Sequence, residues 1–382
     1  VYAKMENLNP SGSVKDRMAI NMVKRAEDAG LLGPGGTIVE STSGNTGLGL
    51  AMAAAVRGYR CVFTIPDKMS QEKIDMLKAY GAEVIVTATD LDHHHPDSYV
   101  EIAKRVARET PGSFYTDQYS NPNNPEAHYL TTGPEIWEAT DGKIDSFIAG
   151  LGTGGTISGT GKYLKEKAAE TGRAVRVVGP DPFGSIYKEA HEKGEWSTPS
   201  LYRVEGIGHD FMVDTLDLTV VDEVINISDR DSFLTARRLA RHEGILSGGS
   251  TGTVFAGALQ EARKLGPGKI VVAIVCDSGD RYISKCFNDE WMRDMGYFAP
   301  EAHLGTVQEL LDTRNQDVSS ASPNETLRDV IARMAAKGIS QMPVTSGNGD
   351  LRMIEELDIL RAVASNEHGL DDSVRDVARP LE

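Results

Sequence analysis

The first candidate for chemistry is Lys15, which ends a run of small residues and precedes an apolar-periodic segment. Residues 9–17 read NPSGSVKDR, and apolar residues then recur with helical spacing from position 18 to 26. Asp16 suits the positive end of a helix that begins here. A lysine partly withdrawn from water has a lowered pKa and becomes a nucleophile toward carbonyls. Most such lysines are solvated surface cations, so the assignment depends on what else the chain supplies.

A second candidate is the loop at residues 41–47, which reads STSGNTG. It follows a strand-like segment, 37–40, and leads into a Gly/Ala-rich helical run, 48–55. This order presents free backbone N–H groups and a positive helix dipole to a carboxylate or phosphate. The alternative is an ordinary helix cap, but a cap uses one hydroxyl and this loop offers four. We therefore expect an anion site.

A third loop, residues 152–156, reads GTGGT and lies between an apolar strand at 146–151 and a helix at 157–167. Three glycines let the backbone curl its N–H groups around a phosphate, and the threonines add hydroxyl donors. The loop lacks both the dinucleotide pattern and the Gly-Lys ending of an ATP loop. It favours a compact phosphate on an organic cofactor, with a plain tight turn as the alternative.

An amine nucleophile, a carboxylate site and a phosphate site are the parts that a pyridoxal phosphate enzyme needs. The motifs SVKDR (13–17), TSGNTG (42–47) and GTGGT (152–156) resemble the three signatures of the cysteine synthase/cystathionine β-synthase family. The resemblance covers residues 1 to about 298. It implies a fold type II pyridoxal phosphate enzyme.

Two subgroups of that family differ in finer motifs. EGIGHDF (205–211), GGS (248–250) and the stretch from DS (277–278) to NDEW (288–291) resemble the cystathionine β-synthases. SGDRY (278–282) resembles the O-acetylserine sulfhydrylases instead. The sequence therefore favours the first subgroup and keeps the second as the alternative.

The resemblance assigns roles to particular residues. Pyridoxal phosphate would be held as an aldimine on Lys15, with Asn45 on its ring oxygen and Ser278 on its ring nitrogen. Its phosphate would bind to Gly152, Thr153, Gly154, Gly155 and Thr156. The implied substrate-binding residues are Ser41, Thr42, Ser43, Gly44, Thr46, Tyr119, Gly206 and Gly208.

The implied reaction is β-replacement. L-Serine would displace Lys15, whose amine then takes the Cα proton. Loss of hydroxide would give an aminoacrylate, to which homocysteine adds to form L-cystathionine. A serine beside the ring nitrogen favours such β-elimination over transamination. The alternatives are a cysteine synthase that uses O-acetylserine and sulfide, and a catalytically idle regulatory or assembly protein of the same fold.

Composition limits the class of partner. The 382 residues carry a net charge of −16, which disfavours nucleic acid and anionic membranes. No apolar run approaches 18 residues, and no secretory pattern is present. Cys61, Cys276 and Cys286 are scattered and odd in number, which indicates free thiols in the cytoplasm. No ligand-spaced Cys/His set predicts a metal, and 93–95 (HHH) is interpreted as an exposed loop. The family implies a homo-oligomer, a dimer or higher.

These loops need a framework of alternating strands and helices. Strands are expected at 61–66, 83–87, 175–179 and 270–275, and helices at 71–80, 231–242 and 254–265. Such a pattern predicts an α/β fold with mostly parallel sheets, helices on both faces, and sites at the carboxyl ends of the strands. We expect a two-domain catalytic region, 1–298, with a mobile small subdomain at about 41–125. Family members carry some dozens of residues before the lysine motif, so an N-terminal segment is expected to be missing.

The chain changes character after a linker at 299–305. Residues 301–382 hold 15 acidic and 8 basic side chains. Segments within 306–382 resemble one regulatory motif of the CBS type, with a second, incomplete copy opening at 373–377. Glu355 stands where ligand-binding copies have Thr or Ser, so we expect no adenosyl nucleotide to bind. We expect the tail to affect assembly, with an apolar face that pairs between subunits and consists of Leu327, Val330, Ile331 and Met334.

Overall fold

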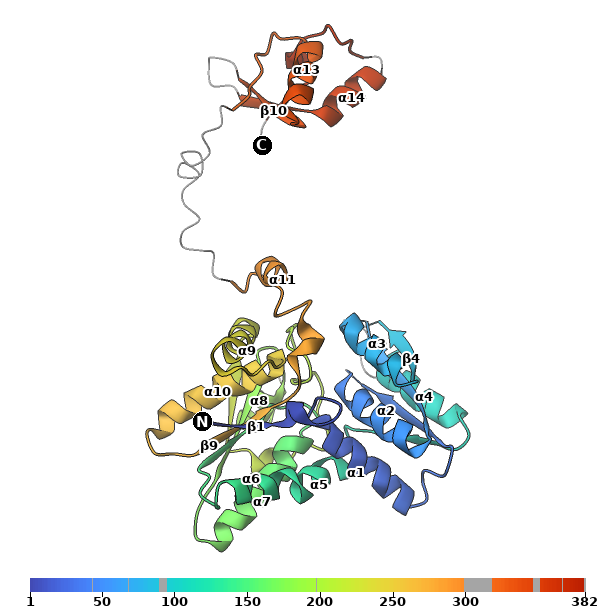
Figure 1. Cartoon of the computed structure of the whole chain (residues 1–382), viewed down its shortest axis with the longest axis vertical. Helices are drawn as coiled ribbons and strands as arrows, with labels where there is room; N and C mark the ends of the chain where they lie inside the picture. The colour runs from blue at the N-terminus through green and yellow to red at the C-terminus, as the bar shows by residue number, and fades with distance from the viewer. Residues whose placement is uncertain are drawn as a thin grey trace. The chain divides into compact units, whose positions relative to one another are not determined.

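The computed structural model describes residues 1–42, 44–67, 69–88, 95–196, 198–298, 318–345, 351–365 and 367–380. The chain forms two compact units, Val1–Pro300 and Glu301–Glu382 (Figure 1). Within the described residues, no helix combines the length and the apolar character that crossing a membrane requires.

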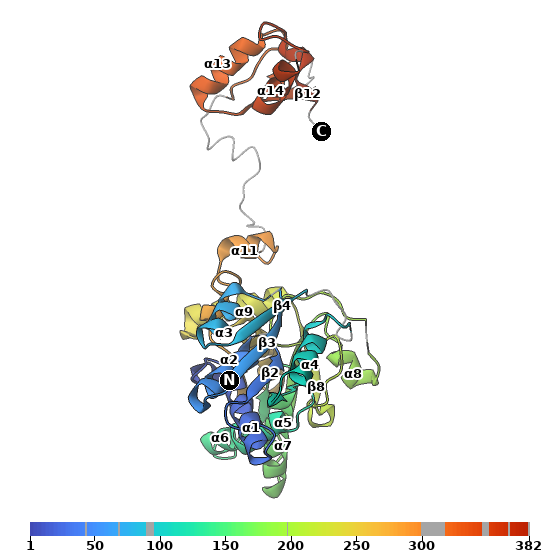
Figure 2. The ribbon, with the colours of Figure 1, turned by 90° about the vertical axis from the view of Figure 1, so that its right-hand side faces the viewer.

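The first unit is built on two parallel sheets. The larger has the strand order β1-β9-β6-β7-β8, and the smaller has the order β4-β3-β2-β5. All their pairings are parallel. The bounds of the larger sheet are β1 (Tyr2–Met5), β6 (Ser146–Ile148), β7 (Arg176–Pro182), β8 (Glu223–Ile227) and β9 (Val271–Val275). Those of the smaller are β2 (Thr37–Ser41), β3 (Arg60–Pro66), β4 (Glu83–Thr87) and β5 (Ser113–Tyr115), of which β2, β3 and β4 lie side by side in Figure 2.

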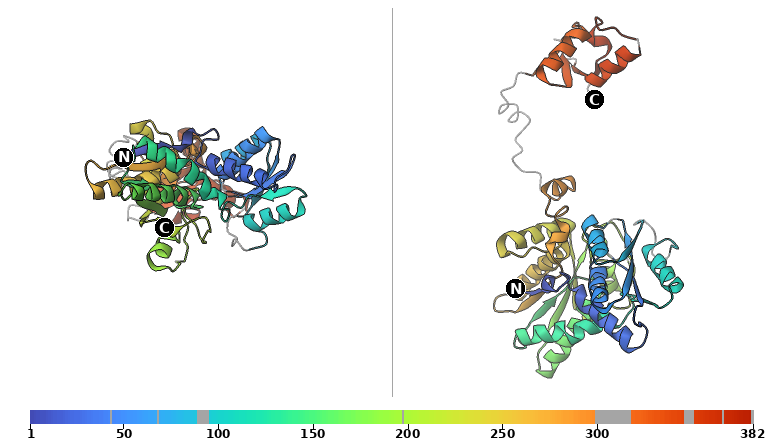
Figure 3. Two further views of the ribbon diagram at one scale, coloured as in Figure 1. Left: turned by 90° about the horizontal axis from the view of Figure 1, so that it is seen from below. Right: turned by 45° about the vertical axis from the view of Figure 1, so that its right-hand side comes forward.

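Helices cover both faces of both sheets, which confirms the predicted α/β fold. The small lobe consists of the smaller sheet with α2 (Asn45–Arg57), α3 (Gln71–Ala79) and α4 (Tyr99–Glu109). Figure 3 shows α2 and α4 on opposite sides of that sheet. The large lobe consists of the larger sheet with α5 (Asn123–Leu130), α6 (Thr132–Ala139), α7 (Gly155–Glu170), α8 (Tyr187–Lys193), α9 (Asp229–Glu243) and α10 (Gly249–Leu265). Helix α1 (Lys15–Asp28) packs on both α2 and α5, and α11 spans Asp289–Asp294.

The interior strand β9 contributes to two hydrophobic cores, one on each face of the larger sheet. Val272 and Ile274 pack with α6, α7 and α8 on one face. Val271, Ala273 and Val275 pack with α9 and α10 on the other. An unbroken run of β-branched and small apolar residues suits a parallel strand that is buried on both faces.

Helix α10 begins at Gly249, five residues before the expected start at position 254. Glycine is a poor helix former, so the GGSTG segment looks like a loop by propensity. A Cβ at Gly252 would lie 1.8 Å from the carbonyl oxygen of Ser232 in α9, and one at Gly249 would overlap Phe233. The glycines therefore allow α10 to pack closely on α9, and this packing overrides propensity.

The described residues of the second unit form a small antiparallel sheet and two α-helices. Its elements are α13 (Leu327–Lys337), β10 (Gln341–Thr345), β11 (Leu351–Glu355), α14 (Glu356–Ala364) and β12 (Arg379–Pro380). Val374 and Ala378, which belong to or follow the segment expected to open a second motif, pack into the same core as α13.

The prediction that an apolar face of α13 pairs between subunits is wrong for three of its four residues. Leu327, Val330 and Met334 are buried in the unit's own core, and only Ile331 is exposed. The helical periodicity is present in the structure, but it reflects packing on the local sheet.

Candidate active site

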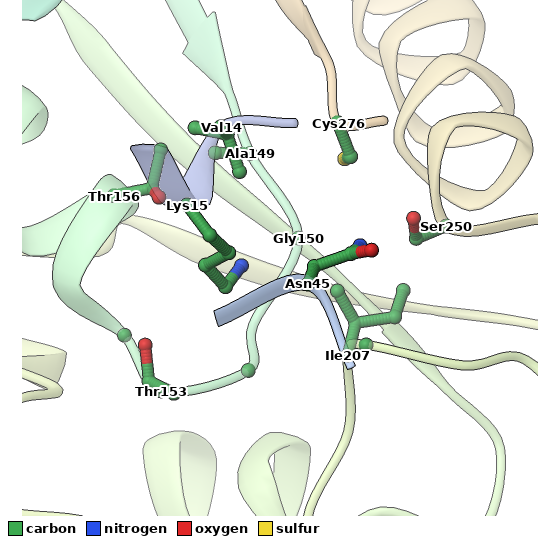
Figure 4. A pocket seen from close by; sticks show the side chains of 13 residues that line it. Val14, Lys15, Asn45, Ala149, Gly150, Thr153, Thr156, Ile207, Ser250 and Cys276 are labelled. Atoms are coloured by element: carbon green, nitrogen blue, oxygen red, sulfur yellow. The ribbon is translucent and has the colours of Figure 1, made fainter. Parts of the chain in front are cut away.

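One pocket gathers loops from both lobes of the first unit (Figure 4). Except for the segment Gly206–Ile207, the lining residues lie near the start of a helix or the end of a strand, where sites of parallel α/β folds are expected. The lining residues are Val14, Lys15, Asn45, Ala149, Gly150, Gly152, Thr153, Gly154, Thr156, Gly206, Ile207, Ser250 and Cys276.

Lys15, the first residue of α1, extends its amine into this pocket. Burial lowers the pKa of Lys15, and the nearby charge of Lys73 lowers it further, whereas Cys276 and Asp277 oppose the shift. Within the described residues no carboxylate forms an ion pair with this amine. The geometry thus favours a neutral, nucleophilic lysine.

The loop before Lys15 is fixed to the end of β9. The Val14 N–H donates to the Cys276 carbonyl at 2.8 Å, and the Ser278 N–H donates to the Gly12 carbonyl at 3.0 Å. Asp16 accepts from the Ser11 N–H at 2.7 Å, although burial raises the pKa of Asp16. These bonds hold the start of α1, and with it the lysine, at the carboxyl end of the large sheet.

The loop at 152–156 forms a cradle at the start of α7. Gly154 has φ +81°, and a Cβ there would lie 2.4 Å from Cα of Leu216. A Cβ at Gly155 would lie 1.9 Å from Asn124 Oδ1, so this backbone excludes side chains. The first N–H groups of a helix lack intrahelical partners and point at an anion. The cradle therefore fits the phosphate of pyridoxal phosphate.

Threonine hydroxyls border this cradle. The Thr156 hydroxyl lies 3.2 Å from His128 Nε2, and the Thr153 hydroxyl accepts from the Asn124 amide at 3.1 Å. Burial lowers the pKa of His128 to about 3, so its ring is neutral at physiological pH. The wall of the cradle thus offers polar groups without adding a fixed charge.

Of the described part of the 41–47 loop, only Asn45 lines the pocket. The Thr42 hydroxyl accepts from the N–H groups of Gly44 and Gly47, and the Thr46 hydroxyl donates to Gln118 at 2.7 Å. The Thr42 hydroxyl therefore shapes the turn, in which Gly44 has φ +118°, whereas the Thr46 hydroxyl ties the loop to Gln118. Ser41 is buried at the end of β2, and Ser43 lies outside the described residues.

The other predicted residues take different places. Gly206 lines the pocket, and the Gly208 N–H donates to the Leu151 carbonyl at 2.6 Å. Tyr119 packs edge-on against His209 and Phe211, with ring centroids 5.1 and 5.4 Å apart. Ser278 precedes the short 3₁₀ turn Gly279–Tyr282 and is not part of the lining.

Ser250 and Cys276 line the pocket but were not predicted to. Ser250 is buried in the first turn of α10, and Cys276 follows β9 directly. Burial raises the pKa of Cys276 to about 11, which keeps the thiol protonated. The GGS motif at 248–250 was the available signal for Ser250.

Among the described residues, no group of three or more His, Cys, Asp or Glu side chains could hold a metal ion. His93 and His94 of the histidine run lie outside the described residues, whereas His95 Nδ1 accepts from the Asp97 N–H at 3.1 Å.

Comparison with known proteins gives two family matches. Residues 1–277 match the model of the pyridoxal-phosphate dependent enzymes, and residues 307–365 match the CBS domain. The chain is 44% identical over 356 residues to cystathionine beta-synthase of Mus musculus, covering 91% of this chain but 62% of that protein. It is 41% identical over 357 residues to the cystathionine beta-synthase of Dictyostelium discoideum, covering 91% of this chain and 70% of that protein. The chain thus spans less than two thirds of the mouse protein's length.

Two solved structures resemble the first unit. One is an O-acetylserine dependent cystathionine beta-synthase from Helicobacter pylori, with a TM-score of 0.67 and 38% identity over 73% of this chain and 87% of that one. The other is a hydrogen sulfide-producing enzyme from Fusobacterium nucleatum, with a TM-score of 0.67 and 36% identity over 73% of this chain and 90% of that one.

Proposed function

Because the chain belongs to the cysteine synthase/cystathionine β-synthase family of pyridoxal-phosphate dependent enzymes, we propose that it exchanges the β-hydroxyl of L-serine for the thiol of homocysteine. The product is L-cystathionine. The observation that carries this proposal is the position of Lys15, whose pKa is lowered by burial, in the same pocket as the glycine cradle at 152–156.

Pyridoxal phosphate, when bound, supplies a reactive carbonyl and a sink for the electrons that a lost Cα proton leaves behind. The backbone N–H groups at 152–156 bind its phosphate, and Asn45 donates to its ring oxygen. We assign its ring nitrogen to Ser250 in place of Ser278, because Ser250 lines the pocket. A neutral hydroxyl there restrains transamination, which is the role first expected of Ser278.

Lys15 moves the proton of the proposed reaction at its Nζ atom. A neutral amine inside the pocket holds the cofactor and then accepts the Cα proton of serine, which a charged ammonium could not do. The loop at 41–47 orients the substrate carboxylate through its backbone. Gly206 and Ile207 also line the pocket, and we assign the incoming thiol to their side of it.

A second candidate is cysteine synthesis from O-acetylserine and sulfide. The Helicobacter pylori enzyme is dependent on O-acetylserine, and the Fusobacterium nucleatum enzyme produces hydrogen sulfide. The SGDRY motif at 278–282 also supports this candidate. The two activities share the Lys15 chemistry and differ in leaving group and nucleophile.

A competition assay separates these candidates. Purified protein is given pyridoxal phosphate with serine or O-acetylserine, each combined with homocysteine or sulfide, and the amino-acid products are measured by mass spectrometry. We expect serine with homocysteine to give the highest rate. A dominant rate with O-acetylserine and sulfide establishes the cysteine synthase instead. A protein whose pyridoxal phosphate absorption band is unchanged in Lys15→Ala, or absent altogether, is the idle assembly protein.

The proposal includes a homo-oligomer in the cytoplasm. Cys61, Cys276 and Cys286 are all unpaired, which supports a reducing compartment. Sedimentation of the purified protein tests the oligomeric state.

A further inference from the structure

Both ends of the Asn45 amide are engaged by the large lobe, although Asn45 belongs to α2 of the small lobe. Its Nδ2 donates to Asp277 Oδ2 at 2.6 Å, and its Oδ1 accepts from Arg281 Nη1 at 2.6 Å. A carboxylate only accepts and a guanidinium only donates, so the two partners decide which end of the amide is oxygen. The second N–H of the same nitrogen is then left for a ligand in the pocket that Asn45 lines.

Arg281 reaches this amide from a buried position. Its side chain is 2% exposed, and its Nη2 donates to the Ser11 carbonyl in the loop that carries Lys15. A Cβ at Gly12 would lie 2.7 Å from the same Nη2, so glycine is needed there for the guanidinium to enter. Arg281 thus contacts the segments that deliver both Lys15 and Asn45.

This arrangement is unfavourable as a purely structural device. In the described part of the chain, Arg281 Nε has no hydrogen-bond partner, and no carboxylate forms an ion pair with the guanidinium. A buried charge that is not fully paired destabilises a fold, and an apolar side chain would usually fill the space at lower cost. The presence of a charged side chain here is explained if Arg281 is needed to orient the amide of Asn45.

We propose that Arg281 is a positioning residue that fixes the amide of Asn45 so that its free N–H meets the ring oxygen of the bound cofactor. Arg281 acts through Asn45 and does not touch the reacting atoms itself. This inference rests on the proposed function, because it concerns the same pyridoxal phosphate site. Asp277, which also accepts from the Tyr282 hydroxyl at 2.6 Å, holds the other end of the amide.

The test compares Arg281→Gln, Arg281→Lys, Asn45→Ala and the double variants with the wild-type chain. Arg237→Gln is the matched control. Arg237 is also buried, at 6% exposed, but its guanidinium donates to the Cys286 carbonyl at 2.9 Å and to Asp289, neither of which lines the pocket. For each protein, titration gives the dissociation constant of pyridoxal phosphate, and spectroscopy gives the wavelength and pH midpoint of its absorption band. Thermal unfolding of the cofactor-free form reports on folding.

We expect Arg281→Gln to weaken cofactor binding by about tenfold or more, as the loss of a charged hydrogen bond predicts. The absorption band should shift as well, and Arg281→Lys should retain part of both properties. In the Asn45→Ala background, Arg281→Gln should have no further effect on affinity or on the band. Arg237→Gln should lower the unfolding temperature and leave the cofactor affinity and the band unchanged.

Wild-type affinity and an unchanged band in Arg281→Gln would overturn the inference, as would full additivity with Asn45→Ala. If Arg281→Gln does not fold, Arg281→Lys takes its place, and its effect on cofactor affinity is compared with and without Asn45→Ala. An absorption band missing from the wild type refutes the proposed function itself, and this inference with it. A normal wild-type band with unaffected Arg281 variants refutes the inference alone.

Discussion

The Nζ atom of Lys73 lies 2.6 Å from Oε2 of Glu205, and this buried ion pair joins the small lobe to the large lobe. Lys73 belongs to α3 and is 1% exposed, whereas Glu205 directly precedes the pocket residues Gly206 and Ile207. Lys285 pairs with the other carboxylate oxygen at 2.6 Å. Burial alone would raise the pKa of Glu205, but the charges of Lys73 and Lys285 bring it below its ordinary value.

Replacing Lys73 by Met should therefore destabilise the first unit by about 2–3 kcal/mol, because a buried carboxylate loses one of two charged partners. Chemical denaturation measures this loss. Lys165→Met is the control, since its pair with Asp222 at 2.8 Å is about one third exposed on both sides and should contribute less than about 1 kcal/mol. Equal effects at the two positions would contradict the role given to Lys73.

The lowered pKa of Lys15 predicts a pH-dependent stability of the cofactor-free protein. In the unfolded chain, Lys15 keeps its proton up to a pH of about 10.4, whereas in the folded chain it releases the proton at a lower pH. Between the lowered pKa of the folded state and about 10.4, the unfolded state binds more protons, so stability should rise with pH. Lys15→Met removes the cost of burying the amine, so it should be more stable than the wild type at neutral pH.

The advantage of Lys15→Met should shrink as the pH approaches about 10.4, the ordinary value for lysine. Urea denaturation of both proteins without pyridoxal phosphate, from neutral to alkaline pH, checks this. A difference in stability between the two proteins that stays constant across that range would show that burial does not lower the pKa of Lys15. Added pyridoxal phosphate should stabilise the wild type more than the variant, which keeps the phosphate cradle but lacks the amine.

The cradle at 152–156 predicts a specific effect of Gly154→Ala. The new methyl group would lie 2.4 Å from Leu216 at a left-handed backbone position, so the free energy of unfolding should fall by more than about 3 kcal/mol. Binding of pyridoxal phosphate should be lost as well. Gly172→Ala is a matched control, because Gly172 has φ +69° and no neighbour within 4 Å. That change should cost about 1–2 kcal/mol and leave the affinity for pyridoxal phosphate unchanged. Similar losses for the two variants would argue against a packed cradle.

The tail is expected not to confer activation by an adenosyl nucleotide. Glu355 caps α14 with Asp358, and Arg379 pairs with both carboxylates at 3.0 and 2.9 Å, so these groups are already engaged. Calorimetric titration with S-adenosylmethionine, ATP and AMP should give no saturable heat. Saturable micromolar binding that disappears when the chain is cut near Pro300 would contradict this prediction.

The candidate site was predictable from sequence where the chemistry is local. Lys15, Asn45 and the 152–156 loop stand in contiguous motifs whose strand–loop–helix order implies their surroundings. Ser250 was missed because its helix starts with glycines that propensity assigns to a loop, and only packing on α9 makes them helical.

Arg281 was missed for a different reason. Its contacts with Ser11 and Asn45 join residues more than 230 positions apart in the sequence. Such contacts depend on the pairing of β1 with β9 and on the packing of the two lobes, which no local pattern reveals. Two hydroxyls of the 41–47 loop illustrate the converse, because Thr42 caps N–H groups of the turn itself and Thr46 bonds the distant Gln118.

The pairing of Tyr2 in β1 with Val272 in β9 also sets an order of events during synthesis. The two residues are 270 positions apart, so at about 5–20 residues per second β1 waits roughly 15–55 s for its partner. The loop that carries Lys15 is anchored to Cys276, just beyond β9. On the ribosome, we therefore expect the complete cofactor site to form only after nearly the whole first unit has emerged. Conditions that slow translation would lengthen the time for which β1 is open to wrong partners.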